Sequence, residues 1–237
     1  MFNGGAKTSN GLLLNDILQV EPAVQQDLYY IVLWFRTHQV CFTADIAKLY
    51  HQIFIHPQDR DLQRILWGYS SEEPIQEYRL TTVTYGTSSA PFLATRCLKK
   101  LADDTKCQYP RDAQVLSNDF YVDDLLSGTS TTEEAIKVQQ EISLVETAGF
   151  TLRKWASNHS TFLDTIPKEL QETQKTLSLD NEDGITTLGL QWNLKNDQLQ
   201  VKNSITQAQP SDSTESAKCK VLATTASILH PLGILTL

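Results

Sequence analysis

Two adjacent aspartates, Asp123 and Asp124, interrupt an apolar and aromatic stretch that runs from Asp119 to Leu126 (DFYVDDLL). Neighbouring ionised carboxylates repel each other, so a folded chain keeps them together only when they are solvated or bridged by cations. If this stretch is a strand rather than a hairpin tip, alternation sends the two side chains to opposite faces, one as a direct ligand and the other as a looser one. A further ligand must then come from a distant segment. The candidate is Asp45, at the end of a buried strand predicted over 40–45 (VCFTAD).

The composition is that of a globular chain with room for one sizeable domain, or for a domain and an appendage. Of its 237 residues 41% are hydrophobic and 20% charged, which disfavours wholesale disorder, collagen and coiled coils. The four cysteines form no C-x-x-C pair, so neither a disulfide scaffold nor a zinc finger is expected. A reducing intracellular compartment fits this pattern, in the cytoplasm, in a cytoplasmic particle or in the nucleus. No membrane span is expected, because the apolar run Tyr29–Phe35 is far too short.

The charge distribution argues against an electrostatic nucleic-acid binder that works alone. Such domains usually carry a basic face, whereas this chain has a net charge of -8. Acidic residues outnumber basic ones most strongly between residues 111 and 161, around the aspartate pair. This local surplus favours cation binding, and a solvated acidic surface remains the alternative.

Strand and helix signals alternate irregularly along the chain, without the rhythm of a parallel sheet. We therefore expect an α+β fold, with an antiparallel sheet and helices on one face. A capping box at Thr131 and Glu134 and a glycine at Gly149 bound the clearest helix, and Gly128 is expected to end the preceding strand. Strands are predicted over 40–45, 62–67, 75–82, 150–155 and 186–192, helices over 46–53 and 92–102, and an exposed polar connection over 203–218.

The carboxylate pattern suits magnesium-dependent phosphoryl chemistry. Mg²⁺ prefers octahedral oxygen coordination and usually takes one or two protein carboxylates together with substrate phosphates. Two such ions about 3.5 to 4 Å apart can activate a 3′-hydroxyl and stabilise the leaving pyrophosphate. Asp45 and Asp123 suit this task. The histidines form no H-x-x-x-H pair and no G-x-S-x-G is present, so zinc and serine-hydrolase chemistry have no support.

Three segments together resemble a known family, the palm of reverse transcriptases. F-T-A-D-I-A-K-L-Y resembles motif A, Y-G-T-S-S-A-P-F motif B and Y-V-D-D motif C, in the family's order. The chain is most similar to the Bel/Pao-type long-terminal-repeat retrotransposons. That likeness rests on K-T-S-N-G-L-L-L-N-D from Lys7, H-P-Q-D-R-D-L-Q-R-I-L-W from His56, A-G-F-T-L-R-K-W from Ala148 and I-L-H-P-L-G from Ile228.

The resemblance implies a polymerase-type palm with partial fingers and a role for particular residues. Asp45, Asp123 and Asp124 would form the catalytic triad and bind two Mg²⁺ ions, with Mn²⁺ as an alternative. Tyr50 would be the steric gate that excludes a 2′-hydroxyl, or simply a core aromatic. Tyr85 and Gly86 would lie against the incoming nucleotide and the template. Lys154 would be a motif D lysine that protonates pyrophosphate, or a solvated lysine. Leu188, Gly189 and Leu190 would form the primer grip, or a hairpin with a packed tryptophan.

The resemblance also implies an organisation and a set of partners. Residues 1–200 would be partial fingers and palm, and residues 201–237 a linker and the start of a thumb or connection. The partners would be an RNA template, a DNA primer, a deoxynucleoside triphosphate and the fingers, thumb and ribonuclease H parts of a polyprotein. The basic residues that the family's fingers carry ahead of this region have no match here, and the chain stops where a thumb or connection would start. It is therefore expected to be truncated at both ends.

Two other functions remain open. A non-catalytic remnant or captured domain would bind nucleic acid or a protein partner and would tolerate loss of the carboxylates. Another palm-type enzyme, such as a nucleotide cyclase, would share the carboxylates but does not predict the motif B helix start or the steric-gate position.

Overall fold

The structure is a computed structural model that describes residues 2–22, 24–142, 146, 148–172 and 184–201. Residues 203–218, the I-L-H-P-L-G segment and almost all of the predicted 201–237 unit lie outside this part. Within the described residues, no helix is long and apolar enough to cross a membrane.

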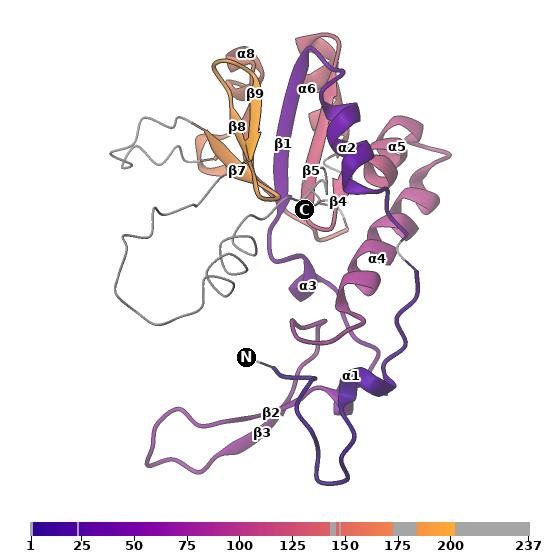
Figure 1. The fold of residues 1–237 in the computed structure, drawn as a ribbon, viewed down its shortest axis with the longest axis vertical. Helices are drawn as coiled ribbons and strands as arrows, with labels where there is room; N and C mark the ends of the chain where they lie inside the picture. Colours follow the sequence, from indigo (N-terminus) through magenta and orange to yellow (C-terminus); the bar gives the residue numbers. More distant parts are fainter. Residues whose placement is uncertain (1, 23, 143–145, 147, 173–183, 202–237) are drawn as a thin grey trace, which may run out of the picture.

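An antiparallel sheet of four strands forms the centre of the molecule (Figure 1). Its order is β4-β5-β1-β6, so the longest of these strands, β1, lies between β5 and β6. All but one residue of β1 are buried, as its apolar sequence predicts. The strands are β1 (Val40–Ile46), β4 (Phe120–Tyr121), β5 (Asp124–Thr129) and β6 (Leu152–Ser157).

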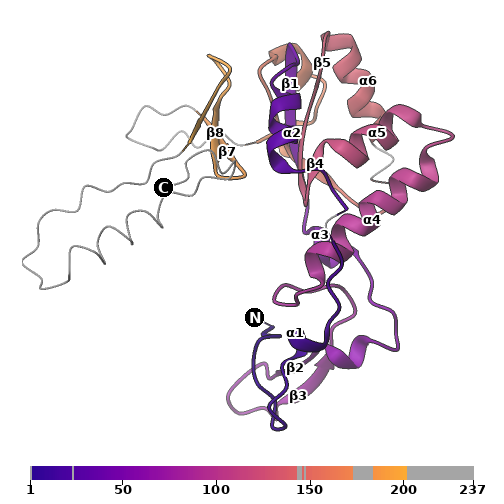
Figure 2. The same cartoon turned by 45° about the vertical axis from the view of Figure 1, so that its right-hand side comes forward.

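The three longest helices of the described residues cover one face of this sheet (Figure 2). They are α4 (Ala90–Thr105), α5 (Pro110–Asn118) and α6 (Thr132–Ile142), followed by the short α8 (Ser160–Leu163). Alternate β1 side chains, such as Phe42 and Ile46, join the apolar stripes of these helices in the main core. The hydroxyl of Thr131 accepts from the backbone N–H of Glu134 at 3.3 Å, as expected for this helix start.

The opposite face packs against a helix and a small second sheet. The helix is α2 (Leu28–Phe35), and the side chain of Asp27 caps its start. The second sheet contains β7 (Ile185–Thr187), β8 (Leu190–Asn193) and β9 (Gln198–Val201). Phe35 and Trp192 meet edge to face, with ring centroids 5.0 Å apart. The expected α+β class with antiparallel sheets and helices is confirmed, and α2 adds a helix on this second face.

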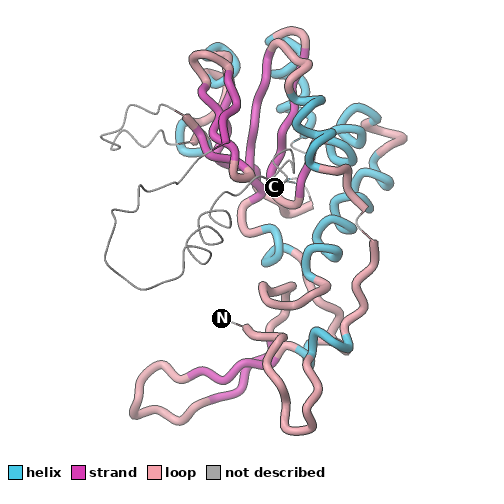
Figure 3. The backbone as a smooth tube through the Cα atoms, in the orientation of Figure 1, coloured by secondary structure: helices cyan, strands magenta, loops and turns pink. Residues whose placement is uncertain are grey.

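A two-stranded hairpin projects away from the central sheet (Figure 3). It pairs β2 (Arg64–Trp67) with β3 (Gln76–Arg79), shorter than the predicted strands. Two short helices lie near it, α1 (Leu14–Ile17) and η1 (Arg60–Leu62). Elsewhere α3 (Leu49–Gln52) and η2 (Lys168–Leu170) are similarly short.

Several sequence predictions were wrong in detail. The helix predicted over 46–53 is only the turn α3, because Lys48 has the left-handed φ of 52°. Gly128 lies inside β5 instead of ending it: a Cβ there would meet the His38 Cβ at 2.6 Å, so glycine is needed for close packing. The strand predicted over 186–192 is two strands joined by a turn at Leu188 and Gly189.

Candidate active site

Strand register brings Asp45 and Asp124 together. In the antiparallel pairing of β1 with β5, these two residues are direct partners at the end of the ladder. Side chains of such partners share one face, with Cβ atoms about 4.5 to 5.5 Å apart. Two acidic residues that lie far apart in the chain therefore meet, as predicted.

Asp123 lies in the turn between β4 and β5. Val122, just before it, has a left-handed φ of 56° and closes the hairpin. The carbonyl of Asp123 accepts from the N–H of Ile46 at 2.8 Å, which fixes the turn against the end of β1. The hairpin-tip prediction is thus confirmed. The prediction that strand alternation separates Asp123 from Asp124 is wrong, because Asp123 is not part of a strand.

The three carboxylates share one electrostatic environment. Burial, followed by the charges of Asp123 and Asp45, raises the pKa of Asp124 to about 6. Burial and, to a smaller extent, the charge of Asp45 also raise the pKa of Asp123. The charge of Asp45 therefore makes ionisation of Asp123 and Asp124 less favourable, and the charge of Asp123 does the same for Asp124, which is the situation that a nearby cation relieves.

Two cations of β6 already contact Asp45. Arg153 Nε lies 3.1 Å and Lys154 Nζ 2.8 Å from the two carboxylate oxygens of this side chain, which is 16% exposed. Both reach it because β6 has a bulge here: Thr43 pairs with Ala156 but Asp45 with Arg153, which leaves one extra residue on β6. Lys154 has a left-handed φ of 53° at this point. A bulge re-aims a side chain that strict alternation would send to the other face.

The three carboxylates have the donor atoms of a metal site but not its arrangement. Carboxylate oxygens are the ligands that Mg²⁺ and Mn²⁺ prefer. Within the described residues, however, no group of three Asp, Glu, His or Cys side chains is arranged to hold an ion. The two carboxylate oxygens of Asp45 contact Arg153 and Lys154 instead. The donor chemistry fits, and a bound cation requires Asp45 to leave these ion pairs.

Tyr50 and Tyr85 lie next to this cluster. Their rings meet edge to face at 4.8 Å, and Tyr85 is half exposed. Burial and then the charge of Asp123 raise the pKa of Tyr50, so its phenol lies within electrostatic reach of that carboxylate. Tyr50 also packs against the main core. Tyr50 therefore packs against the core and also lies near Asp123, so both predicted roles, steric gate and core aromatic, stay open.

Gly86 makes a close contact, but with the chain itself. Its φ is 94°, and a Cβ there would lie 2.4 Å from the carbonyl oxygen of Phe2. Asn15 fastens the same turn: its Nδ2 donates to the Gly86 carbonyl at 3.1 Å, and its Oδ1 accepts from the Ser88 N–H at 2.9 Å. The neighbour of Gly86 in this structure is the N-terminal segment, and its predicted contact with a nucleotide or template stays a prediction.

The predicted primer-grip residues form a tight turn beside Asp124. Leu188 and Gly189, with φ of 50° and 77°, are the two central residues of the β7–β8 hairpin, as in a type I′ turn. Leu190 is buried in the second core. A hydrogen bond from the side chain of Thr187 lowers the pKa of Asp124, against the effect of burial, so the hairpin reaches the carboxylate cluster.

Sequence reasoning missed two contributors to this cluster, Arg153 and Thr187. Arg153 lies within the A-G-F-T-L-R-K-W segment, and Thr187 directly precedes Leu188. Bulges and hairpin contacts depend on register, so the only available signal was the proximity of Arg153 to Lys154 in the sequence.

Comparisons with known proteins give fold-level similarities only. No protein-family model matches the chain, and no curated protein matches it. Among solved structures, it is similar to a foamy viral protease-reverse transcriptase in complex with an RNA/DNA hybrid, with a TM-score of 0.49 and 16% identity over 77% of this chain and 20% of that chain. The same enzyme in complex with double-stranded DNA gives 0.49 and 18%, over 77% and 26%. A mutant of the prototype foamy virus enzyme gives 0.47 and 17%, over 62% and 19%. The chain spans about a fifth to a quarter of their length.

Proposed function

We propose that the chain is the palm, with part of the fingers, of an RNA-directed DNA polymerase from a Bel/Pao-type retrotransposon. The observation that carries the proposal is the register of β1 and β5, which makes Asp45 and Asp124 direct partners, with Asp123 hydrogen-bonded to the end of β1. The three acidic residues of the motifs could have been scattered, and they meet at one end of the sheet. RNA template, DNA primer and deoxynucleoside triphosphate are the proposed substrates.

In this proposal Asp45, Asp123 and Asp124 would hold two Mg²⁺ ions. When bound, such ions supply charge stabilisation to the attacking and leaving oxygens of an in-line displacement. The protein's own contribution is to place carboxylates whose mutual repulsion favours a cation between them. Release of Asp45 from β6 would leave Arg153 and Lys154 free to bind phosphate oxygens, and Lys154 in position to protonate pyrophosphate.

Primer extension on an RNA template tests the proposal. The full chain is incubated with a DNA primer, deoxynucleotides and Mg²⁺ or Mn²⁺, and the variants Asp123→Asn and Asp124→Asn are compared with Asp104→Asn on the exposed surface of α4. Loss of a group that stabilises transition-state charge costs about a hundredfold or more in rate. We expect extension by the wild type and Asp104→Asn only. Absence of extension by every protein, or equal extension by all of them, would overturn the proposal for this chain.

One observation favours the second candidate, a non-catalytic nucleic-acid-binding remnant. Asp45 is neutralised by two cations, which is a stable arrangement without a metal. In this case nucleic-acid affinity would be the same in the wild type and in Asp123→Asn, with no extension and no effect of divalent ions. Filter binding with a primer–template duplex, run beside the extension assay, distinguishes the two functions.

A further inference from the structure

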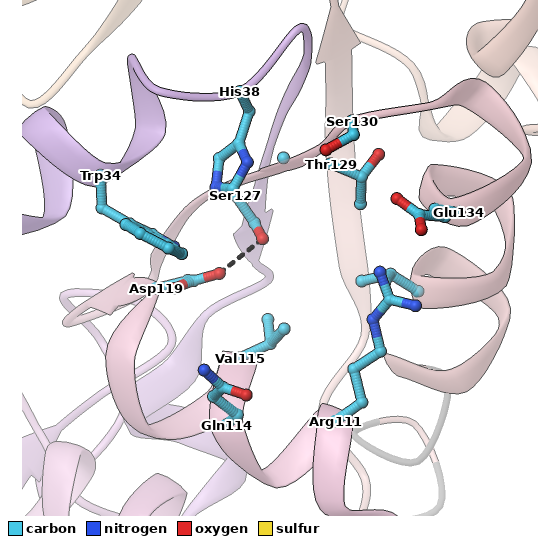
Figure 4. A pocket seen from close by; sticks show the side chains of 12 residues that line it. Trp34, His38, Arg111, Gln114, Val115, Asp119, Ser127, Thr129, Ser130 and Glu134 are labelled. Carbon is cyan, nitrogen blue, oxygen red and sulfur yellow. Dashed lines mark hydrogen bonds between the residues drawn. The ribbon is translucent and has the colours of Figure 1, made fainter.

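A pocket lies beside β5, at the end of the strand opposite Asp124. It has a volume of about 220 Å³ and is lined by the last β5 residues, Ser127, Gly128 and Thr129. The pocket exists because β4 pairs with only the first two residues of β5. Past that point, helices α2, α5 and α6 surround the strand edge without filling the space beside it (Figure 4).

A buried carboxylate lines this pocket. Asp119 is only 5% exposed, and its Oδ2 accepts from the Ser127 hydroxyl at 2.5 Å (Figure 4). Its other oxygen, Oδ1, has no hydrogen-bond partner among the described residues and is not fully enclosed by them. Asp119 is one of the residues that line the pocket, so a ligand bound there can reach its carboxyl group. Burial raises the pKa of Asp119 to about 6, so the charged form is costly until a donor binds it.

The charges around the pocket favour a cation. Glu134 from α6 and Arg111 from α5 lie on the side opposite Trp34, and neither side chain forms an ion pair within the described part of the chain (Figure 4). Burial lowers the pKa of His38, so this ring is neutral near neutral pH. With Asp119 ionised, two carboxylates face one guanidinium. An anion would meet both carboxylates, and an apolar ligand would leave Asp119 unpaired.

The aromatic wall narrows the choice of cation. The indole of Trp34 lies edge to face with His38, at 5.0 Å between ring centroids, and is half exposed. A guanidinium is planar, stacks on aromatic rings and donates paired hydrogen bonds to carboxylates, whereas an ammonium is a compact and strongly hydrated charge. A flat cation therefore fits a site with one indole and two carboxylates better than an amine.

We propose that this pocket binds a guanidinium group, which donates to Asp119 Oδ1 and Glu134 and packs against Trp34. The group could belong to a free small molecule or to an arginine side chain of a partner protein. The pocket shares no residue with the carboxylate cluster, so the proposal is independent of the polymerase assignment.

Titration of the full chain, followed by NMR, tests the proposal. The probes are agmatine, as a free guanidinium compound, N-acetyl-arginine methylamide, as an arginine side chain, and N-acetyl-citrulline methylamide, its uncharged isostere. The indole N–H of Trp34, assigned with Trp34→Phe, should shift in a saturable way. Loss of a charge-assisted hydrogen bond costs about tenfold in affinity, so citrulline should bind at least that much more weakly. Tighter binding of agmatine would indicate a small molecule, and tighter binding of the blocked arginine a protein partner.

Matched variants locate the binding. Glu134→Gln should weaken the better guanidinium probe about tenfold, while Glu133→Gln, the neighbouring exposed residue outside the pocket, should leave it unchanged. Asp119→Asn should weaken binding at least as much, measured above pH 7 where the carboxylate is charged. Equal affinity for arginine and citrulline, or equal effects of Glu133→Gln and Glu134→Gln, would overturn the proposal.

Discussion

Asp119 shows how one buried side chain couples the stability of the fold to pH. It is almost fully buried and its pKa is raised from 3.8 to about 6 by burial, with Ser127 acting in the opposite direction. A raised carboxyl pKa in the folded state means that the neutral form is favoured there. The stability that it contributes is present below about pH 4 and is lost as pH rises through about 6.

Asp119→Asn should therefore stabilise the protein at neutral pH. Two pKa units correspond to about 3 kcal/mol, and we expect about 1 to 3 kcal/mol at pH 7.5 and no gain at pH 4. Urea denaturation at both values checks this, with the exposed Asp164→Asn as control. An equal effect at pH 4 and 7.5 would show that ionisation is not the cause.

Tyr50 carries the prediction of sugar selection. If its ring is the gate, Tyr50→Val should increase incorporation of ribonucleotides relative to deoxynucleotides by about tenfold or more, since a steric clash is removed. Tyr50→Phe keeps the ring and should keep the selectivity. Primer extension with both nucleotide types measures the ratio. A change of stability without a change of this ratio would leave Tyr50 as a core aromatic.

At the scale of elements, turns and bulges determine how the candidate site is assembled. The β4–β5 hairpin carries Asp123 at its tip, and the bulge in β6 aims Arg153 and Lys154 at Asp45. The sequence left a strand and a hairpin tip open for this stretch, because its apolar residues suit a strand and its paired aspartates were assigned to neither. It did not indicate the bulge, because a bulge depends on the register between strands that are distant in sequence.

The turn at Gly86 can be tested by adding one methyl group. Gly86→Ala places a Cβ 2.4 Å from the Phe2 carbonyl in a left-handed backbone, whereas the same change at Gly11, with φ of 82°, meets open space. The backbone penalty is about 1 kcal/mol at either site, and the clash should add about 1 to 3 kcal/mol at Gly86. Thermal denaturation of both variants measures the difference. Equal losses would mean that the N-terminal segment does not pack on this turn in solution.

At the scale of the whole molecule, two apolar cores lie on opposite faces of the central sheet. The larger joins the sheet to α4, α5 and α6, and the smaller joins it to α2 and the β7–β9 sheet through Phe35 and Trp192. The ion pair of Arg36 with Asp197, and the hydrogen bond from the Trp192 indole to the same carboxylate, close the smaller core. The arrangement predicts that the two faces differ in local stability.

Trp192→Ala should loosen the second sheet before it affects the central sheet. Removal of a fully buried tryptophan costs about 3 to 5 kcal/mol, and Trp67→Ala on the exposed β2–β3 hairpin should cost less than about 1 kcal/mol. Hydrogen exchange should become faster in β7–β9 and stay slow in β1 and β5. Uniformly faster exchange would show that the two cores unfold as one unit.

The sequence by itself determined the class of fold and which acidic residues are candidates for the site. Apolar periodicity and capping residues act over a few positions, so α6, β1 and the carboxylate motif could be read locally. Local signals for α2 and α5 were also present, in the cap at Asp27 and in Pro110 at the first helical position, although neither helix was predicted.

Only the tertiary structure decided that Asp45 opposes Asp124, that a bulge supplies Arg153 and Lys154 to the same carboxylate, and that a pocket opens beside Asp119. Each of these depends on strand register and on the packing of helices against a strand edge. Such contacts join residues that are far apart in the chain, and their geometry follows from the whole fold rather than from any short segment.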